Sequence, residues 1–443
     1  MATTDLQSSD FEQRTMQKLT WKLMPLLCAC FMAAFLDRVN VGFAKEQMMS
    51  DLKFSDDIYS TGAGIFFVGY FLFEVPSNLI MERVGARMWI ARIMIIWAFI
   101  SGSMLFVKSE TVFYVLRFFL GAAEAGFFPG VIFYLTAWFP RAYRSRTTAI
   151  FMSAAVLSGV LGNPISGLIL EVDGAMGWHG WQWLFFLEAL PSLLLGIVVL
   201  AVLPNKPADA KWLSQEEKDF VTSRIDAERK EVESENHGHL SVLKAFADPR
   251  VLLVSLVYFL SVCGAYGLDF FMPSLIKKAF VGASNVQVGL LAAVPPFLAL
   301  FVMNYWGRSS DRKQERKFHV AAAFALAGTG LMLASLPVPP IVALVAMAMA
   351  VAGRWSAIAP FWGLSTMFLT GRAAAGAIAL INSIGNLGGL VGPKIMTWFK
   401  DGVGDYVMGL RVLAGFLFVS AFIAATMKVK RAPVAAPQAA AAE

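Results

Sequence analysis

Twelve apolar segments, each long enough to cross a lipid bilayer, dominate this sequence of 443 residues. A membrane-spanning helix needs about 20 mainly apolar residues, because a helix rises 1.5 Å per residue and the hydrocarbon core is about 30 Å thick. Only 15% of the residues are charged, whereas soluble proteins carry about 25%. The sequence therefore predicts an all-α membrane protein with twelve transmembrane helices, at residues 21–43, 57–81, 88–107, 112–139, 147–170, 181–203, 251–273, 286–306, 318–336, 340–369, 374–399 and 407–427.

The basic residues predict the orientation of these helices. If both termini are cytoplasmic, the cytoplasmic loops and tails hold 24 Lys and Arg, against six on the other side. Such an excess marks the cytoplasmic side of a membrane protein, so the net charge of +6 reports topology and not nucleic-acid binding. The first 20 residues are polar and lack the pattern of a cleavable signal. We therefore expect a multi-pass protein of the plasma (inner) membrane with both termini in the cytoplasm.

A long polar stretch divides the chain into two sets of six spans. Ser214 and Glu217 form a capping-box pattern there, which predicts a surface or linking helix that runs to about Lys230. The predicted organisation is a cytoplasmic tail, a six-helix bundle, a cytoplasmic linker, a second six-helix bundle and a disordered tail, at 1–20, 21–203, 204–249, 250–427 and 428–443.

The two halves repeat each other at a fixed offset of 229 residues. Subtracting this offset maps Ser284 onto Ser55 and Pro393 onto Pro164, and it also matches the short loops after the second span of each half. Parallel repeats of six spans are typical of transporters that bind substrate between the halves near the bilayer midplane. The matched loops contain acid–base pairs for which we predict a gating role, with simple stop-transfer charge as the alternative: Glu82, Arg83, Asp311 and Arg312.

Charged residues inside the fourth span point to the same kind of function. Arg117 and Glu124 lie seven residues apart, so on a helix they project to the same side about 10 Å from each other. Each would cost about 3 kcal/mol at the bilayer centre if it faced lipid. A functional role in an interior cavity is the default for such residues, and structural ion pairs between helices are the alternative.

Four motifs resemble those of the anion:cation symporter family within the major facilitator superfamily. They are FLDRVNVGFA at 35–44, RFFLGAAEAGFFPG at 117–130, WGRSSDR at 306–312 and ALINSIGNLGG at 379–389. The resemblance covers nearly the whole chain apart from the tails and the central linker. It implies the major facilitator fold, two six-helix bundles with pseudo-two-fold symmetry, and proton-coupled import of an organic anion such as an aromatic acid, a dicarboxylate or a sugar acid.

The resemblance also implies roles for individual residues. Arg38 and Arg117 would contact the substrate anion, while Asp37 and Glu124 would carry the coupling proton. The physical chemistry agrees, because a substrate carboxylate that engages an arginine weakens the hold of that arginine on a neighbouring acid. Binding of the anion and of the proton would then favour each other, which is the basis of symport.

Arg354 and Asp269 are unexpected in such a family. Arg354 lies deep in the tenth span, where it would bind a second substrate carboxylate or would pair with Asp269 of the seventh span. A substrate role favours a dicarboxylate or an aromatic acid. Further candidate substrate contacts, each of which would otherwise serve helix packing, are Asn382, Asn386, Tyr70, Tyr266 and Trp355.

Other functional classes lack their sequence signals. The chain contains no P-loop, no nucleophile motif and no cysteine cluster, so we predict no enzyme, no cofactor and no metal site. Sodium coupling or anion exchange is the alternative within transport, and a membrane receptor is the alternative outside it. The expected partners are a small organic anion, protons and the lipid bilayer, without nucleic acid, and the protein is expected to be a monomer.

Overall fold

The computed structural model describes residues 2–235, 248–367, 371–399 and 406–427, and the regular structure in these ranges is helical. Eleven helical segments there are long and apolar enough to cross a membrane. At the position of the eleventh predicted span, 374–399, two shorter helices follow each other, α16 (Gly371–Asn386) and α17 (Gly388–Trp398). The predicted all-α membrane fold is confirmed. The tail predicted as disordered, 428–443, lies outside the described residues.

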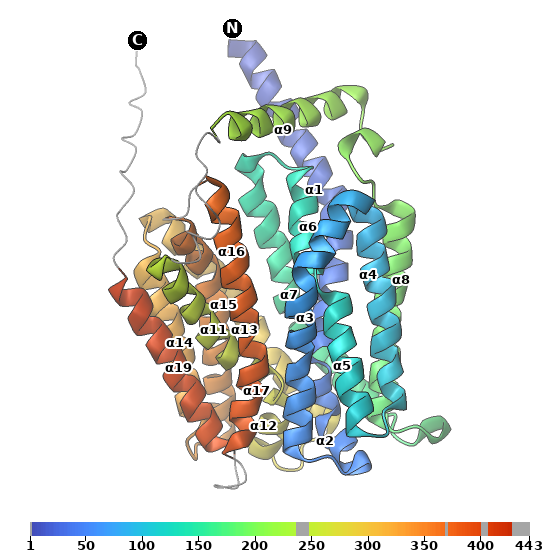
Figure 1. The fold of residues 1–443 in the computed structure, drawn as a ribbon. Helices are drawn as coiled ribbons and strands as arrows, with labels where there is room; N and C mark the ends of the chain where they lie inside the picture. Colours follow the sequence, from blue (N-terminus) through green and yellow to red (C-terminus); the bar gives the residue numbers. More distant parts are fainter. Residues whose placement is uncertain (1, 236–247, 368–370, 400–405, 428–443) are drawn as a thin grey trace.

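Two helical bundles stand side by side (Figure 1). The first contains α1 (Ala2–Val39), α2 (Val41–Leu52), α3 (Asp56–Val84), α4 (Ala86–Ser103), α5 (Glu110–Glu124), α6 (Phe127–Thr136), α7 (Arg141–Leu170) and α8 (Gly180–Val202). The second contains α11 (Pro249–Asp269), α12 (Met272–Ala279), α13 (Asn285–Lys313), α14 (Lys317–Ala334), α15 (Pro340–Thr366), α16, α17 and α19 (Val407–Thr426). We call the end of the molecule that carries α9 (Gln215–Glu235) the linker face, and the end that carries α2 and α12 the far face.

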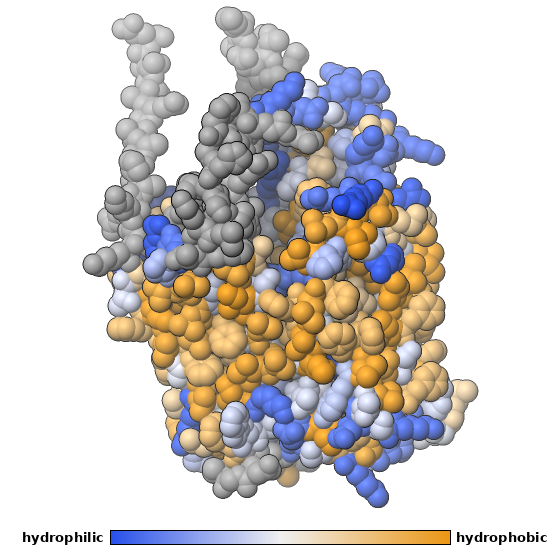
Figure 2. All heavy atoms as spheres, in the orientation of Figure 1, coloured by the Kyte–Doolittle hydropathy of each residue, from blue (hydrophilic) through white to orange (hydrophobic). Residues whose placement is uncertain are grey.

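A wide apolar band surrounds the bundles. Figure 2 shows hydrophobic side chains across the middle of the molecule and hydrophilic side chains towards both ends. Large apolar side chains on the outside of both bundles are exposed, among them Phe99, Leu194, Phe301 and Phe422. An exposed apolar surface of this extent is unfavourable in water and favourable in lipid, so the band is the membrane-facing surface.

In the described part of the chain, four spans consist of two successive helices, which meet at Asn40, at Ala125–Gly126, at Phe270–Phe271 and at Leu387. The backbone leaves the helical region at Ala125–Gly126, whereas Asn40, Phe270, Phe271 and Leu387 keep right-handed helical angles. Gly126 has φ +87°, and a Cβ there would lie 2.3 Å from Ser77 Oγ, so the break in the fourth span requires glycine. Irregular backbone at membrane depth is tolerated only where protein or a cavity surrounds it, and Ser77 of α3 packs against this break.

Helix α9 docks on the linker-face end of the first bundle. The predicted capping box is present, because Glu217 N–H donates to Ser214 Oγ at 3.2 Å and Ser214 N–H donates to Glu217 Oε2 at 2.8 Å. Lys18 forms an ion pair with Glu217 at 2.7 Å, and Arg144 pairs with Glu228 at 3.0 Å. Partial burial raises the pKa of Glu217, but the hydrogen bonds from Lys18 and Ser214 outweigh it and leave the pKa below its usual value. Because the first 20 residues have this partner, most of them continue α1 as helix instead of forming a separate tail.

The bundles meet closely at the far face. Helix α7 packs against α13 there, and a Cβ added to Gly289 would lie 2.5 Å from the carbonyl oxygen of Asn163. The side chain of Asn163 also donates to the carbonyl oxygen of Ala292 at 2.8 Å. Ser55 and Ser284, which the 229-residue offset matches, both cap the helix that follows them. The far face is thus closed by backbone-to-backbone packing between the two halves.

Candidate functional site

A cavity, partly open to solvent, lies between the two bundles. Its lining contains seven of the eight side chains predicted as substrate contacts: Arg38, Tyr70, Tyr266, Arg354, Trp355, Asn382 and Asn386. The rest of the lining is mostly apolar and aromatic, with Phe31, Phe35, Tyr258 and Phe361 among its members. A few convergent polar groups in an apolar wall are typical of small-molecule sites.

Arg38 is the polar centre of the first bundle's side of the cavity. Its guanidinium forms an ion pair with Glu124 of α5 and donates to the hydroxyl of Tyr266 of α11 at 3.0 Å. The guanidinium carbon lies 5.3 Å and 5.2 Å from the ring centres of Phe66 and Tyr70, within cation–π range. The Nε atom of Arg38 is buried without a hydrogen-bond partner among the described residues. The pair therefore has a donor left for a ligand.

The second bundle contributes an ion pair of its own. Arg354 of α15 donates to Asp269 of α11 at 2.6 Å, and both side chains line the cavity. The guanidinium also lies 5.0 Å from the ring centre of Trp355. Of the two interpretations of Arg354 that the sequence left open, the structure shows the ion pair, and it places that pair where a ligand would meet it.

The acids of both pairs lie where a helix ends. Glu124 is the last residue of α5 and Asp269 is the last residue of α11, while Arg38 lies in the last turn of α1. The C-terminus of a helix carries partial negative charge on its free carbonyl groups, which favours a cation nearby. The helix breaks therefore help to hold arginines at the cavity.

Asp37 points away from the cavity into the first bundle. Its carboxylate is 1% exposed and accepts hydrogen bonds from Trp97 Nε1 at 3.1 Å, Ser101 Oγ at 2.9 Å and Ser192 Oγ at 2.6 Å. A second buried acid, Glu188 of α8, lies in the same bundle and accepts from Ser166 Oγ at 2.6 Å. These acids form a polar cluster behind the cavity wall.

Arg117 is the one predicted substrate contact that the structure does not bring to the cavity. It is fully buried and donates to the backbone carbonyl oxygens of Gly62 at 3.2 Å and Ala63 at 3.3 Å on α3. The ring of Phe66 lies between it and Arg38, because both guanidinium carbons lie within 5.3 Å of that ring centre. In this conformation Arg117 ties α5 to α3.

Asn382 and the predicted gating residues have partners of their own. Asn382 donates to Glu74 Oε1 at 2.7 Å and so links α16 to α3 across the two bundles. Asp311 pairs with Arg316 at 2.5 Å within the turn after α13, whereas Glu82, Arg83 and Arg312 are exposed. Among the described residues, the two matched loops form no ion pair with each other, and their gating role stays a prediction.

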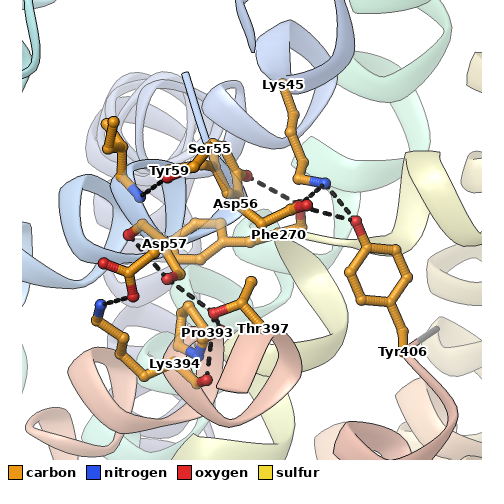
Figure 3. A network of polar contacts seen from close by, with 12 residues as sticks. Lys45, Ser55, Asp56, Asp57, Tyr59, Phe270, Pro393, Lys394, Thr397 and Tyr406 are labelled. Carbon is orange, nitrogen blue, oxygen red and sulfur yellow. Dashed lines mark hydrogen bonds and ion pairs between the residues drawn. The ribbon is translucent and has the colours of Figure 1, made fainter. Parts of the chain in front are cut away.

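A polar network at the far face was not predicted from the sequence. Lys45 of α2 pairs with Asp56 of α3 at 3.0 Å and donates to the hydroxyl of Tyr406, next to α19, at 2.6 Å (Figure 3). In the same view Tyr59 donates to the carbonyl oxygen of Phe270 at 3.0 Å, and Lys394 pairs with Asp57. The network joins the two bundles. Lys45 carried no sequence signal, because it resembles an ordinary loop charge.

No group of three or more His, Cys, Asp or Glu that would hold a metal ion is found in the described part of the chain. The chemistry of the site therefore consists of two arginine–acid pairs, amides and aromatic rings, which suits reversible binding of an anion.

Comparison with known proteins agrees with this geometry. Residues 26–393 match the model of the Major Facilitator Superfamily. A tartrate transporter of Agrobacterium vitis is 48% identical over 94% of this chain and 92% of its own length, and the metabolite transport protein NicT of Pseudomonas putida is 45% identical over 93% and 94%. Among solved structures, a bacterial homologue of the human lysosomal transporter Spinster in an inward-facing conformation superposes with a TM-score of 0.73 at 16% identity, over 92% of this chain and 96% of that one.

Proposed function

Because the chain belongs to the Major Facilitator Superfamily, we propose that it is a secondary transporter that imports an organic anion together with protons by alternating access. A multi-pass membrane protein of this family carries a small molecule between its two bundles. The coupling to protons, the direction of transport and the class of substrate are the parts that we propose.

The ion pair between Arg38 and Glu124 inside the cavity carries the proposal. A substrate carboxylate can bind Arg38 fully only when Glu124 releases it, and protonation of Glu124 is the reaction that does so without leaving an unpaired buried charge. Anion binding and proton binding therefore favour each other. The cavity returns to its empty state when the pair closes again, so each transport cycle would carry a proton with the anion.

The closed far face supports the assignment of the conformation. The excess of basic residues on the loops of the linker face favours a cytoplasmic location for that face, in the plasma (inner) membrane. The described structure is then inward-facing, with the network around Lys45 acting as the outer gate and the contact of Glu74 with Asn382 lying on the inner side of the cavity. Both sets of contacts are formed in this structure, and opening of the far face by rocking of the bundles would break the network around Lys45.

The substrate proposed here is a carboxylate. Relatives at 48% identity are named tartrate transporters, and Asn382, Asn386 and Tyr266 would bind hydroxyl groups of such an anion. Asp37 as a second proton carrier and Arg117 as a second anion contact stay predictions. Sodium coupling, anion exchange and a receptor function are the alternatives.

Uptake into proteoliposomes tests the proposal. In wild type, a pH step with the outside acidic should drive accumulation of tartrate above its external concentration, and a sodium gradient alone should not. Glu124→Gln should keep exchange of internal for external tartrate but accumulate less tartrate than wild type, because a glutamine cannot take up the proton. Glu110→Gln is the matched control, since Glu110 is exposed at the other end of α5. Accumulation by Glu124→Gln at the wild-type level would refute proton coupling at this residue.

A further inference from the structure

We propose that Arg354 and Asp269 form a second anion–proton switch, so that the cavity takes a dicarboxylate together with two protons. The inference rests on the proposed function and extends it to the charge of the substrate and to the number of protons. Asp269 would be the second proton-carrying acid and Arg354 the contact for the second carboxylate.

The first observation is the relation of the two ion pairs to the internal repeat. The offset of 229 residues maps Asp269 onto Asn40, two residues after Arg38, and it maps Arg354 onto Ala125, directly after Glu124. In the first bundle the arginine comes from the first span and the acid from the fourth. In the second bundle the acid comes from the seventh span and the arginine from the tenth, which are the matching spans with the charges exchanged. The cavity thus has one arginine–acid pair from each bundle.

The second observation is that the two pairs are linked across the cavity. Arg38 donates to the hydroxyl of Tyr266 at 3.0 Å, and Tyr266 lies one helical turn before Asp269 on α11. On the other side, the ring of Phe35, one turn before Arg38, lies 6.0 Å from the ring of Trp355, next to Arg354. The two arginines therefore line one cavity from opposite bundles, and we infer that each can bind one end of a dicarboxylate.

The third observation is the charge balance of the cavity. The two pairs are neutral together, and their side chains are only 2% to 14% exposed. A dianion added to this site would leave two uncompensated negative charges, which is costly at such burial. Protonation of Glu124 and Asp269 removes both negative charges of the empty site and leaves two arginines for two carboxylates. A monocarboxylate needs only one of the two switches and would leave the other closed.

A purely structural salt bridge is the competing explanation for Arg354 and Asp269. It would stabilise the fold, would contact no substrate and would not affect the charge that moves during transport. The two explanations therefore predict a different dependence of uptake on membrane potential, which a change in protein stability alone does not alter.

The test uses purified protein in liposomes with a potassium gradient and valinomycin to set the membrane potential. The substrates are tartrate and threonate, which differ only in that one carboxylate of tartrate is a CH₂OH group in threonate. Wild type should prefer tartrate, and its tartrate uptake should not respond to potential, because two protons balance the dianion. Asp269→Asn removes one proton from the cycle. Its tartrate uptake should then accelerate when the inside is positive and slow when the inside is negative.

The double variant Asp269→Asn/Arg354→Gln keeps the site neutral and removes one switch. It should prefer threonate, with a change in the threonate-to-tartrate uptake ratio of about tenfold or more, as expected for loss of a charged hydrogen bond. Thermal melting of each variant establishes that it is folded. Three results would each overturn the inference. The first is tartrate uptake by Asp269→Asn that does not depend on membrane potential, and the second is a double variant that still prefers tartrate. The third is a wild type that prefers monocarboxylates to every dicarboxylate of three to six carbons. The proposed function would survive these results, since it fails only if wild type does not accumulate tartrate in response to a pH step.

Discussion

Lys45 is expected to control which face of the transporter is open. Its side chain is 4% exposed, pairs with Asp56 at 3.0 Å and donates to Tyr406 at 2.6 Å. Its ammonium group also lies within 5.3 Å of the ring centres of Tyr59, Phe271 and Tyr406. The contacts with Tyr406 and Phe271 join the two bundles, so a conformation open at the far face cannot keep them, whereas the pair with Asp56 lies within the first bundle. Loss of the contacts with Tyr406 and Phe271 in Lys45→Met therefore penalises only the state that is closed there.

The size of the effect follows from the contacts that cross between the bundles. The Lys45 ammonium donates to the hydroxyl of Tyr406 at 2.6 Å, and a hydrogen bond that involves a charged group contributes about 1.5–3 kcal/mol. We therefore expect about 2 kcal/mol for Lys45→Met. Because each 1.4 kcal/mol is a factor of ten, the ratio of far-face-open to far-face-closed molecules should rise about 30-fold.

Pulsed electron–electron spin resonance measures this population. Spin labels at Glu110 and Val281, both exposed near the far face, would report its opening in a background without the three native cysteines. Lys45→Met should increase the fraction of long distances. The control is Lys277→Met, which removes an ion pair to Glu46 in which both side chains are 42% exposed, and such exposed pairs contribute at most about 1 kcal/mol. Equal shifts in the two variants, or no shift in Lys45→Met, would refute the assignment of the gate to the buried contacts between Lys45 and the second bundle.

Three further predictions concern other parts of the molecule. Ser192→Ala removes the 2.6 Å hydrogen bond to buried Asp37 and should lower the free energy of unfolding by about 1–3 kcal/mol in denaturant titrations. Ser103→Ala, at a partly exposed site where the hydroxyl bonds the backbone of its own helix, should lower it less. Gly289→Ala forces a Cβ to 2.5 Å from the backbone of α7 and should lengthen the same far-face distances. Glu217→Gln should reduce hydrogen-exchange protection of α9 at neutral pH. Since the folded pKa of Glu217 is lowered, this difference should be present above about pH 4.3 and vanish as the pH falls through the folded pKa, and a difference that grows in acid would contradict it.

The fold was predictable because its main determinants are local. Segment length and hydropathy decide which residues form membrane-spanning helices, and no distant contact has to be known for that. The breaks within spans were not predicted. The break after Glu124 depends on Gly126 and on the close approach of Ser77 from another helix, and sequence periodicity contains no information on that approach.

The candidate site was predictable in part for the same reason. The depth of each charged residue along its helix predicted correctly that these residues lie inside the protein. It did not predict which of them line the same wall of the cavity. Arg117 and Glu124 project to the same side of the fourth span, yet Glu124 reaches Arg38 whereas Arg117 ends on the carbonyl oxygens of α3. The separating element is the ring of Phe66, whose position depends on the packing of α3 against α5. Lys45, by contrast, was not predicted as a functional residue, because its partner Tyr406 lies 361 residues away in the chain.

The helix breaks and the buried charges have a common explanation. A bilayer penalises both an unpaired backbone group and an unpaired charge, so each is tolerated only where the other or a ligand compensates it. At the ends of α5 and α11 the terminal acid pairs with an arginine from another span, and both pairs line the cavity. A substrate anion that takes an arginine away from its acid also changes the electrostatic environment of the free carbonyl groups at that helix end. Binding in the cavity and the geometry of the breaks are therefore coupled, and because α11 continues through its break into α12 at the closed far face, the switch at Asp269 is connected along the chain to the contacts that must open.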